Sequence, residues 1–115
     1  MITPCRDENE FNQLLSDSAG HPVFLFKHST RCPVSAHAHA EYARFAGEHP
    51  EVACREVLVV EQRPLSQQIA QQTGVAHQSP QALLFSGGKV VWNATHFSIS
   101  ADGLQQAYEE ETASR

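Results

Sequence analysis

Apolar residues along the chain occur in two alternating patterns, short continuous runs and sets at helical spacing. The runs are too short for helices and rich in β-branched and aromatic residues, so they predict strands. These runs are VFLFKH (23–28), VACREVLVV (52–60), QALLF (81–85) and KVVW (89–92). The helix-spaced sets predict helices that begin near Asp7, Pro33, Pro64 and Ser100. The predicted order is therefore α-β-α-β-α-β-β-α.

The residues between these patterns support the same boundaries. Asp7 and Glu10 have the spacing of a capping box at the start of the first helix. Pro33 suits the first turn of the second helix, where a backbone N–H would have no partner. Gly87-Gly88 separates the last two strands and favours a tight hairpin. The final residues, 109–115, are expected to form a solvated, frayed tail.

The order of elements predicts an α/β fold. A β-α-β connection requires parallel strands, and a hairpin adds an antiparallel pair, so we expect a four-stranded mixed sheet flanked by helices. With 115 residues, the chain has the length of one compact domain, 1–115.

Composition and charge narrow the classes of function. Hydrophobic residues make up 41% and charged residues 18%, an ordinary balance for a globular protein. The formal net charge is −5 with no basic stripe, which argues against nucleic acid as a partner. No apolar run is long enough to span a bilayer, and the first residues lack the pattern of a signal peptide. We therefore expect a cytoplasmic protein, monomeric or weakly dimeric, with no membrane partner.

The strongest candidate for chemistry is Cys32, between a predicted strand and a predicted helix. The unpaired N–H groups and dipole at a helix start favour the thiolate, which is the attacking form of cysteine. Lys27, His28 and Arg31 precede it in a locally cationic segment. The competing interpretation is that Cys32 is a small buried core residue.

A second signal is Ser79-Pro80, immediately before the third predicted strand. Proline is tolerated at the first residue of a strand, where it often marks a fixed turn. A cis peptide bond here would place the Ser79 backbone beside the Cys32 loop, but the sequence leaves the isomer open.

Together these motifs resemble the thioredoxin superfamily and, more closely, the monothiol bacilliredoxin (YtxJ-type) family of bacterial proteins. The segments that carry the resemblance are KHSTRCPVS (27–35), SPQALLF (79–85) and VVWNATH (90–96). The resemblance implies a thioredoxin-like, glutaredoxin-like fold and a cytoplasmic thiol–disulfide oxidoreductase. Its activity would be to remove bacillithiol from protein mixed disulfides, with bacillithiol as co-substrate and no tightly bound cofactor. Val34 stands where the family usually has isoleucine.

The resemblance also implies roles for individual residues. Cys32 would be the sole nucleophile, because Ser35 occupies the place of the second cysteine of a C-x-x-C motif. Ser35 would either donate a hydrogen bond to the Cys32 thiolate or cap the first helical turn. Pro33 would support the site. Lys27, His28 and Arg31 would face the carboxylates of bacillithiol. Thr30, Ser79 and Pro80 would line the groove, with the Ser79 backbone pairing with substrate like an added strand.

The other two cysteines are expected to stand outside this site. Cys54 lies near the start of its predicted strand, whereas Cys32 follows the end of a parallel one, so the two are too far apart for a disulfide. Core packing is the expected role of Cys54. Cys5 precedes the first helix, where we expect it to be exposed and open to adducts.

Histidines near Cys32 raise the question of a metal site. His37 and His39 are two residues apart on a helix and so point in different directions, which favours solvated histidines on the outer surface of the helix. We therefore expect no metal ligands, with an intersubunit iron–sulfur cluster as a less favoured alternative.

Two other functions remain open at this stage. One is a glutathione- or thioredoxin-coupled reductase on the same fold, and the other is a thioredoxin-like binding module without catalysis.

Overall fold

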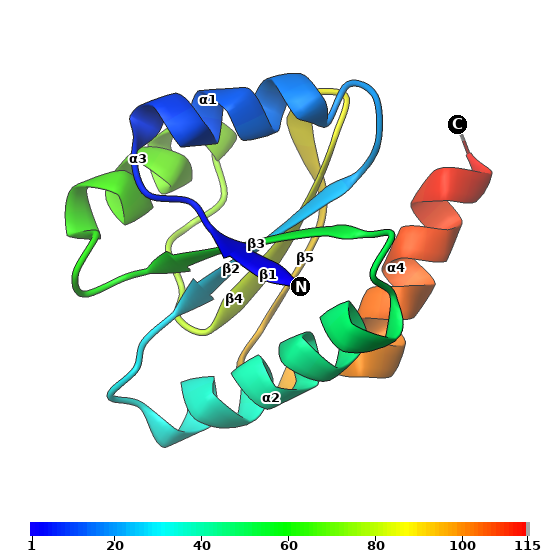
Figure 1. Ribbon diagram of the computed structural model, residues 1–115. Helices are drawn as coiled ribbons and strands as arrows, with labels where there is room; N and C mark the ends of the chain where they lie inside the picture. Colours follow the sequence, from blue (N-terminus) through cyan, green and yellow to red (C-terminus); the bar gives the residue numbers. More distant parts are fainter. Residues whose placement is uncertain (115) are drawn as a thin grey trace.

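A computed structural model describes residues 1–114 as a mixed sheet with helices on both faces (Figure 1). The elements are β1 (Ile2–Pro4), α1 (Glu8–Asp17), β2 (Val23–His28), α2 (Pro33–Glu48), β3 (Ala53–Leu58), α3 (Arg63–Thr73), β4 (Gln81–Ser86), β5 (Lys89–Thr95), the 3-10 turn η1 (His96–Ser98) and α4 (Ala101–Ala113). Helices α1 and α3 cover one face, and α2 and α4 cover the other (Figure 1). The α/β class predicted from the sequence is confirmed.

The sheet has the strand order β1-β3-β2-β4-β5. Strands β1, β3 and β2 are parallel, and β4 runs antiparallel to both β2 and β5. Strands β2 and β3 therefore end at the same edge of the sheet, where β4 begins and β5 ends. Helix α2 starts from this edge, so the loops that follow β2, β3 and β5 lie together with the loop that precedes β4 (Figure 1).

The sheet has five strands where the sequence predicted four. The additional strand is β1, whose three residues pair in parallel with Cys54–Glu56 of β3. A segment this short has no alternation of apolar and polar residues to detect. β1 is held by pairing with the free side of β3, which exists only once the sheet has assembled.

The last helix also continues further than expected. Helix α4 extends to Ala113, across most of the segment expected to be a frayed tail, while Arg115 lies outside the described residues. Side chains one turn apart hold this polar end together. Gln106 Nε2 donates to Glu110 Oε1 over 3.1 Å, and Thr112 Oγ1 donates to the Tyr108 carbonyl over 2.9 Å.

Apolar side chains fill both faces of the sheet. Alternate residues of a strand point to opposite faces, and β2 divides accordingly. Phe24 and Phe26 belong to the core under α2 and α4, whereas Val23 and Leu25 belong to the core under α1 and α3. The pattern continues to the end of β2, so Lys27 and His28 lie on opposite faces.

The start of α1 shows how closely the local sequence pattern is realised. Asp7 Oδ1 accepts a hydrogen bond from the Glu10 N–H at 2.9 Å, as a capping box requires. In the reciprocal bond, Glu10 Oε1 accepts from the Arg6 N–H at 2.7 Å rather than from the Asp7 N–H.

None of the helices within residues 1–114 has the length and apolar character needed to cross a membrane.

Candidate active site

Cys32 lies between β2 and α2 as the N-cap residue of the helix. Its backbone is extended, with φ −113° and ψ 122°, and its side chain is partly exposed. The Cys32 N–H donates to the Ser29 carbonyl at 3.3 Å, and the Cys32 carbonyl accepts from Ala36 at 3.0 Å. Thr30 and Arg31 are exposed beside it. The thiol therefore stands at the positive end of a 16-residue helix and within reach of solvent.

Ser35 is buried and fastens the first turn of α2 to the end of β2. Its Oγ accepts a hydrogen bond from the Ser29 N–H at 2.9 Å and lies 2.7 Å from His28 Nδ1. The hydroxyl donates to His28 when Nδ1 carries no hydrogen. Both bonds hold the turn that presents Cys32, and neither involves the cysteine sulfur.

His28 and His39 stack on each other beneath this turn. Their ring centroids are 4.4 Å apart, and His39 Nε2 lies 2.6 Å from Glu56 Oε1. This bond lowers the pKa of Glu56, while burial and the neighbouring His39 lower the pKa of His28. The prediction that His39 is a solvated surface histidine is wrong, because it is half-buried and faces the sheet; His37 is exposed.

Lys27 does not join the cationic segment beside Cys32. Its side chain is fully buried on the face covered by α1 and α3, where Nζ donates to the Ser66 carbonyl at 3.2 Å and contacts His77 Nδ1 at 3.3 Å. Burial lowers the pKa of Lys27 to about 8. The predicted grouping of Lys27 with His28 and Arg31 is therefore corrected, because adjacent residues of β2 point to opposite faces.

The loop before β4 approaches the same edge of the sheet. The Ser79-Pro80 peptide bond is cis, and Pro80 is buried. The Ser79 Oγ is enclosed and has no hydrogen-bond partner among residues 1–114. The Pro80 carbonyl accepts from the His96 N–H at 3.1 Å, which fixes η1 beside this loop.

The η1 turn is a part of this edge that the sequence analysis missed. His96 has a positive φ of 51°, and the Phe97 side chain is 74% exposed. The ring of Phe97 lies 6.1 Å from that of His37 on α2. The predicted antiparallel hairpin could have shown that η1 lies here, because it brings the end of β5 back to the start of β4.

The other two cysteines are inaccessible. Cys5 and Cys54 are both buried, and burial raises the pKa of each thiol to about 11. The prediction that Cys5 is exposed is wrong: its side chain packs in the core covered by α1 and α3, and its N–H donates to the Glu56 carbonyl at 2.8 Å. Cys54 pairs in register with Phe24, near the start of β3, and belongs to the core.

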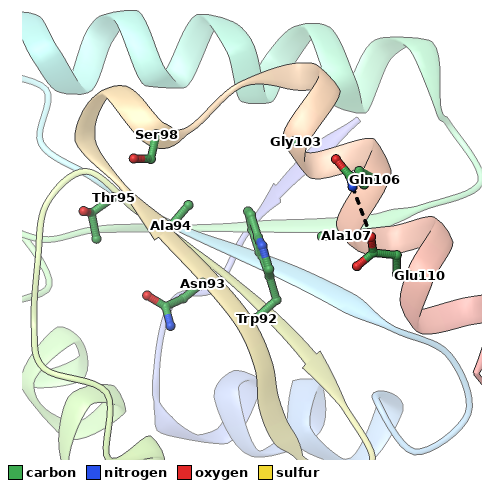
Figure 2. Close-up of a pocket in the computed structure, with 9 residues that line it drawn as sticks. All are labelled: Trp92, Asn93, Ala94, Thr95, Ser98, Gly103, Gln106, Ala107 and Glu110. Atoms are coloured by element: carbon green, nitrogen blue, oxygen red, sulfur yellow. Dashed lines mark hydrogen bonds between the residues drawn. The ribbon is translucent and has the colours of Figure 1, made fainter.

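A wide cavity lies away from this edge. It has a volume of about 570 Å³ and opens between β5 and α4 (Figure 2). Its lining residues are Trp92, Asn93, Ala94, Thr95, Ser98, Gly103, Gln106, Ala107 and Glu110. None of these carries a thiol, an amine, a guanidinium or an imidazole, so this cavity offers no nucleophile for disulfide chemistry.

No cluster suited to a metal ion is found within residues 1–114, taking a cluster as three or more His, Cys, Asp or Glu side chains. The chemistry that the described residues offer at this edge is that of one accessible thiol.

A cysteine between a central strand and the following helix of such a sheet is the arrangement found in thioredoxin-fold redox proteins. Solved structures support placing this chain in that class. A chain described as an oxidoreductase with a thioredoxin fold is 35% identical, with a TM-score of 0.84 and 92% of each chain covered. Fasciola hepatica thioredoxin is 14% identical, with a TM-score of 0.75 and 94% of this chain and 97% of that one covered. A Halobacterium salinarum thioredoxin variant is 19% identical, also with a TM-score of 0.75, covering 95% and 88%. The two thioredoxins are similar in fold alone.

Within that class, residues 3–104 match the family model described as monothiol bacilliredoxin BrxC. The chain therefore belongs to the monothiol bacilliredoxin family.

Proposed function

We propose that this protein removes bacillithiol from protein mixed disulfides in the cytoplasm, with Cys32 as its only nucleophile. The observation that carries the proposal is the contrast among the three cysteines. Cys32 is partly exposed at a helix start, while Cys5 and Cys54 are buried with raised pKa values. Family membership supports a redox function for this thiol.

The reaction is a pair of thiol–disulfide exchanges. The Cys32 thiolate attacks the bacillithiol sulfur of the mixed disulfide, which forms a Cys32–bacillithiol disulfide and releases the client protein as a thiolate. A second bacillithiol thiolate then attacks the bacillithiol sulfur on Cys32. This step forms bacillithiol disulfide and returns the Cys32 thiolate. One disulfide is thus exchanged for another: the client sulfur is reduced to a thiol, the second small thiol is oxidised into bacillithiol disulfide, and the enzyme ends in its starting state.

The surrounding residues support these steps in different ways. Pro33 and the buried Ser35 hold the first turn of α2, which fixes the position of Cys32. Thr30 and Arg31 are exposed on the approach to the thiol, and Arg31 supplies a positive charge for a substrate carboxylate.

The loop before β4 forms the opposite wall in this proposal. The Ser79 backbone would pair with the substrate as an added strand beside Pro80. His28 acts from beneath, through Ser35.

The test compares two mixed disulfides of one model protein, one carrying bacillithiol and the other glutathione. We expect the bacillithiol adduct to disappear preferentially and its mass to appear on Cys32. Intact mass spectrometry of both proteins over time measures the two rates. Equal rates for the two adducts would contradict the bacillithiol assignment and favour a glutathione-coupled reductase. No transfer from either would favour a binding module.

Ser35→Cys should change the chemistry from one thiol to two. Residues 32 and 35 have the spacing of a C-x-x-C motif at a helix start, which is the arrangement of the disulfide-forming cysteines of thioredoxin-like redox proteins. We expect the new thiol to displace bacillithiol from Cys32, so that the variant accumulates an internal disulfide instead of an adduct. Mass analysis without added small thiol distinguishes the two products. Ser35→Ala is the matched control, and it should retain the adduct. An adduct that persists equally in Ser35→Cys would show that position 35 cannot reach Cys32.

A further inference from the structure

A second cavity lies where β2 and β3 end, at the same end of the sheet as Cys32 and on the side covered by α3. Its volume is about 250 Å³, and it is lined by Val59, Val60, Arg63, Ser66, Gln67 and His77. Drug-sized ligands occupy roughly 300–1,000 Å³, so this cavity suits one functional group or a small fragment of a ligand. It is therefore a candidate subsite for part of a substrate.

Positive charge collects around this cavity without a balancing carboxylate. Arg63 and His77 line it, and the buried Lys27 Nζ lies directly behind, bonded to Ser66 and His77. Burial lowers the pKa of His77, and the positive charges of Lys27 and Arg63 lower it further, so the three groups are in electrostatic range. Glu61 is the nearest carboxylate along the chain. Among residues 1–114, neither it nor any other carboxylate forms an ion pair with Lys27, Arg63 or His77.

Buried cations in folded proteins are normally paired with an anion. Lys27 instead contacts a carbonyl and an imidazole nitrogen, which leaves its charge uncompensated. Because Lys27 donates to His77 Nδ1, the hydrogen of the neutral ring is on Nε2. That N–H and the Arg63 guanidinium remain as donors for an anion. A bound carboxylate would complete both the charge balance and the hydrogen bonding.

The cavity and Cys32 share the same edge of the sheet. The Val59 N–H at the cavity wall donates to the His28 carbonyl at 2.9 Å, and His28 in turn contacts Ser35 under the Cys32 turn. His77 belongs to the loop that leads to Pro80, and Gln81 Nε2 fastens that loop by donating to the Ala76 carbonyl at 3.3 Å. The loop that precedes β4 at this end of the strands thus also forms a wall of the cavity.

The structure assigns to this cavity the binding of a carboxylate of the small thiol in the mixed disulfide, with Arg63 and His77 as donors and Lys27 as the charge behind them. The inference rests on the proposed function, which supplies a small thiol that carries carboxylates. It gives Lys27 a part in substrate binding from the face opposite α2, and it accounts for a lysine whose side chain is fully buried.

The test uses succinate, a dicarboxylate without a thiol, so that binding is measured apart from the redox reaction. We expect succinate to shift the backbone NMR signals of residues 59–67 and 77 in the full chain, and uncharged dimethyl succinate to leave them unchanged. Arg63→Gln should raise the succinate Kd at least about fivefold. Lys89→Gln removes the same charge from an exposed site at the far end of β5 and should stay within about twofold of the wild type.

The same variants are then compared as enzymes. Arg63→Gln should raise KM for the bacillithiol adduct at least about fivefold while kcat changes little. Intact transfer in Arg63→Gln, together with no succinate shifts in the wild type, would overturn the cavity assignment and leave the proposed function standing. Equal weakening of succinate binding in Arg63→Gln and Lys89→Gln would also overturn it, as a general charge effect. Succinate bound at these residues, with no transfer from the bacillithiol adduct, would support the anion cavity and overturn its assigned occupant together with the proposed function.

Discussion

Cys32→Ser is expected to lower the rate of bacillithiol removal at least about a thousandfold. A serine hydroxyl is not ionised near neutral pH and cannot form a disulfide, so the exchange loses its nucleophile. Neither remaining cysteine can substitute. Cys5 and Cys54 are fully enclosed, and burial raises both pKa values to about 11, which leaves almost no thiolate at neutral pH.

The matched control is the double variant Cys5→Ala/Cys54→Ala, which keeps Cys32 as the only thiol. We expect its transfer rate to stay within about twofold of the wild type, provided that circular dichroism shows it to be folded. The assay follows loss of the adduct mass from a model protein. Substantial activity in Cys32→Ser that disappears only when Cys5 or Cys54 is also removed would contradict the single-nucleophile account.

Lys27→Met is expected to stabilise the folded protein near pH 7 by about 1–3 kcal/mol. The pKa of Lys27 falls from 10.5 to about 8 on folding, so between these values the unfolded chain binds more protons. The wild type therefore becomes more stable as the pH rises through this window. Below about pH 8 it bears the full cost of a buried charge, which methionine removes, less the lost hydrogen bonds to Ser66 and His77.

The advantage of Lys27→Met should therefore shrink as the pH rises from 8 towards 10.5. Urea unfolding at a series of pH values measures it, and comparison with the wild type cancels the titration of the other groups. Lys89→Met is the control, because it makes the same substitution at an exposed lysine outside the core. A difference between Lys27→Met and the wild type that is constant with pH would contradict the account of Lys27 as an uncompensated buried cation.

Most of the fold follows from local sequence patterns. The strand 23–28 and the start of α2 at Pro33 coincide with the prediction, because a short apolar run and a proline at a helix start have few alternatives. Strand β1 does not follow from such patterns. Its three residues are held by pairing with β3, and only the assembled sheet reveals that edge.

The candidate site divides in a similar way. Cys32 at the turn could be predicted, because the strand and the helix on either side fix its place. The partners of Lys27 and His39 could not, since they come from elements distant in the chain: Ser66 and His77 for the lysine, Glu56 for the histidine. The alternation of side chains along β2 did contain the information that separates Lys27 from His28. The sequence prediction grouped them by their distance along the chain instead.

The central claim is that Cys32 takes the small thiol from the client protein and holds it until a second small thiol arrives. The most direct measurement mixes reduced wild-type protein with an equal amount of bacillithiolated client, without free thiol, and determines the mass of each intact protein and of the Cys32 peptide. The account predicts a free client and one bacillithiol on Cys32. A disulfide between Cys32 and the client itself, or an adduct that stays on the client, would contradict it.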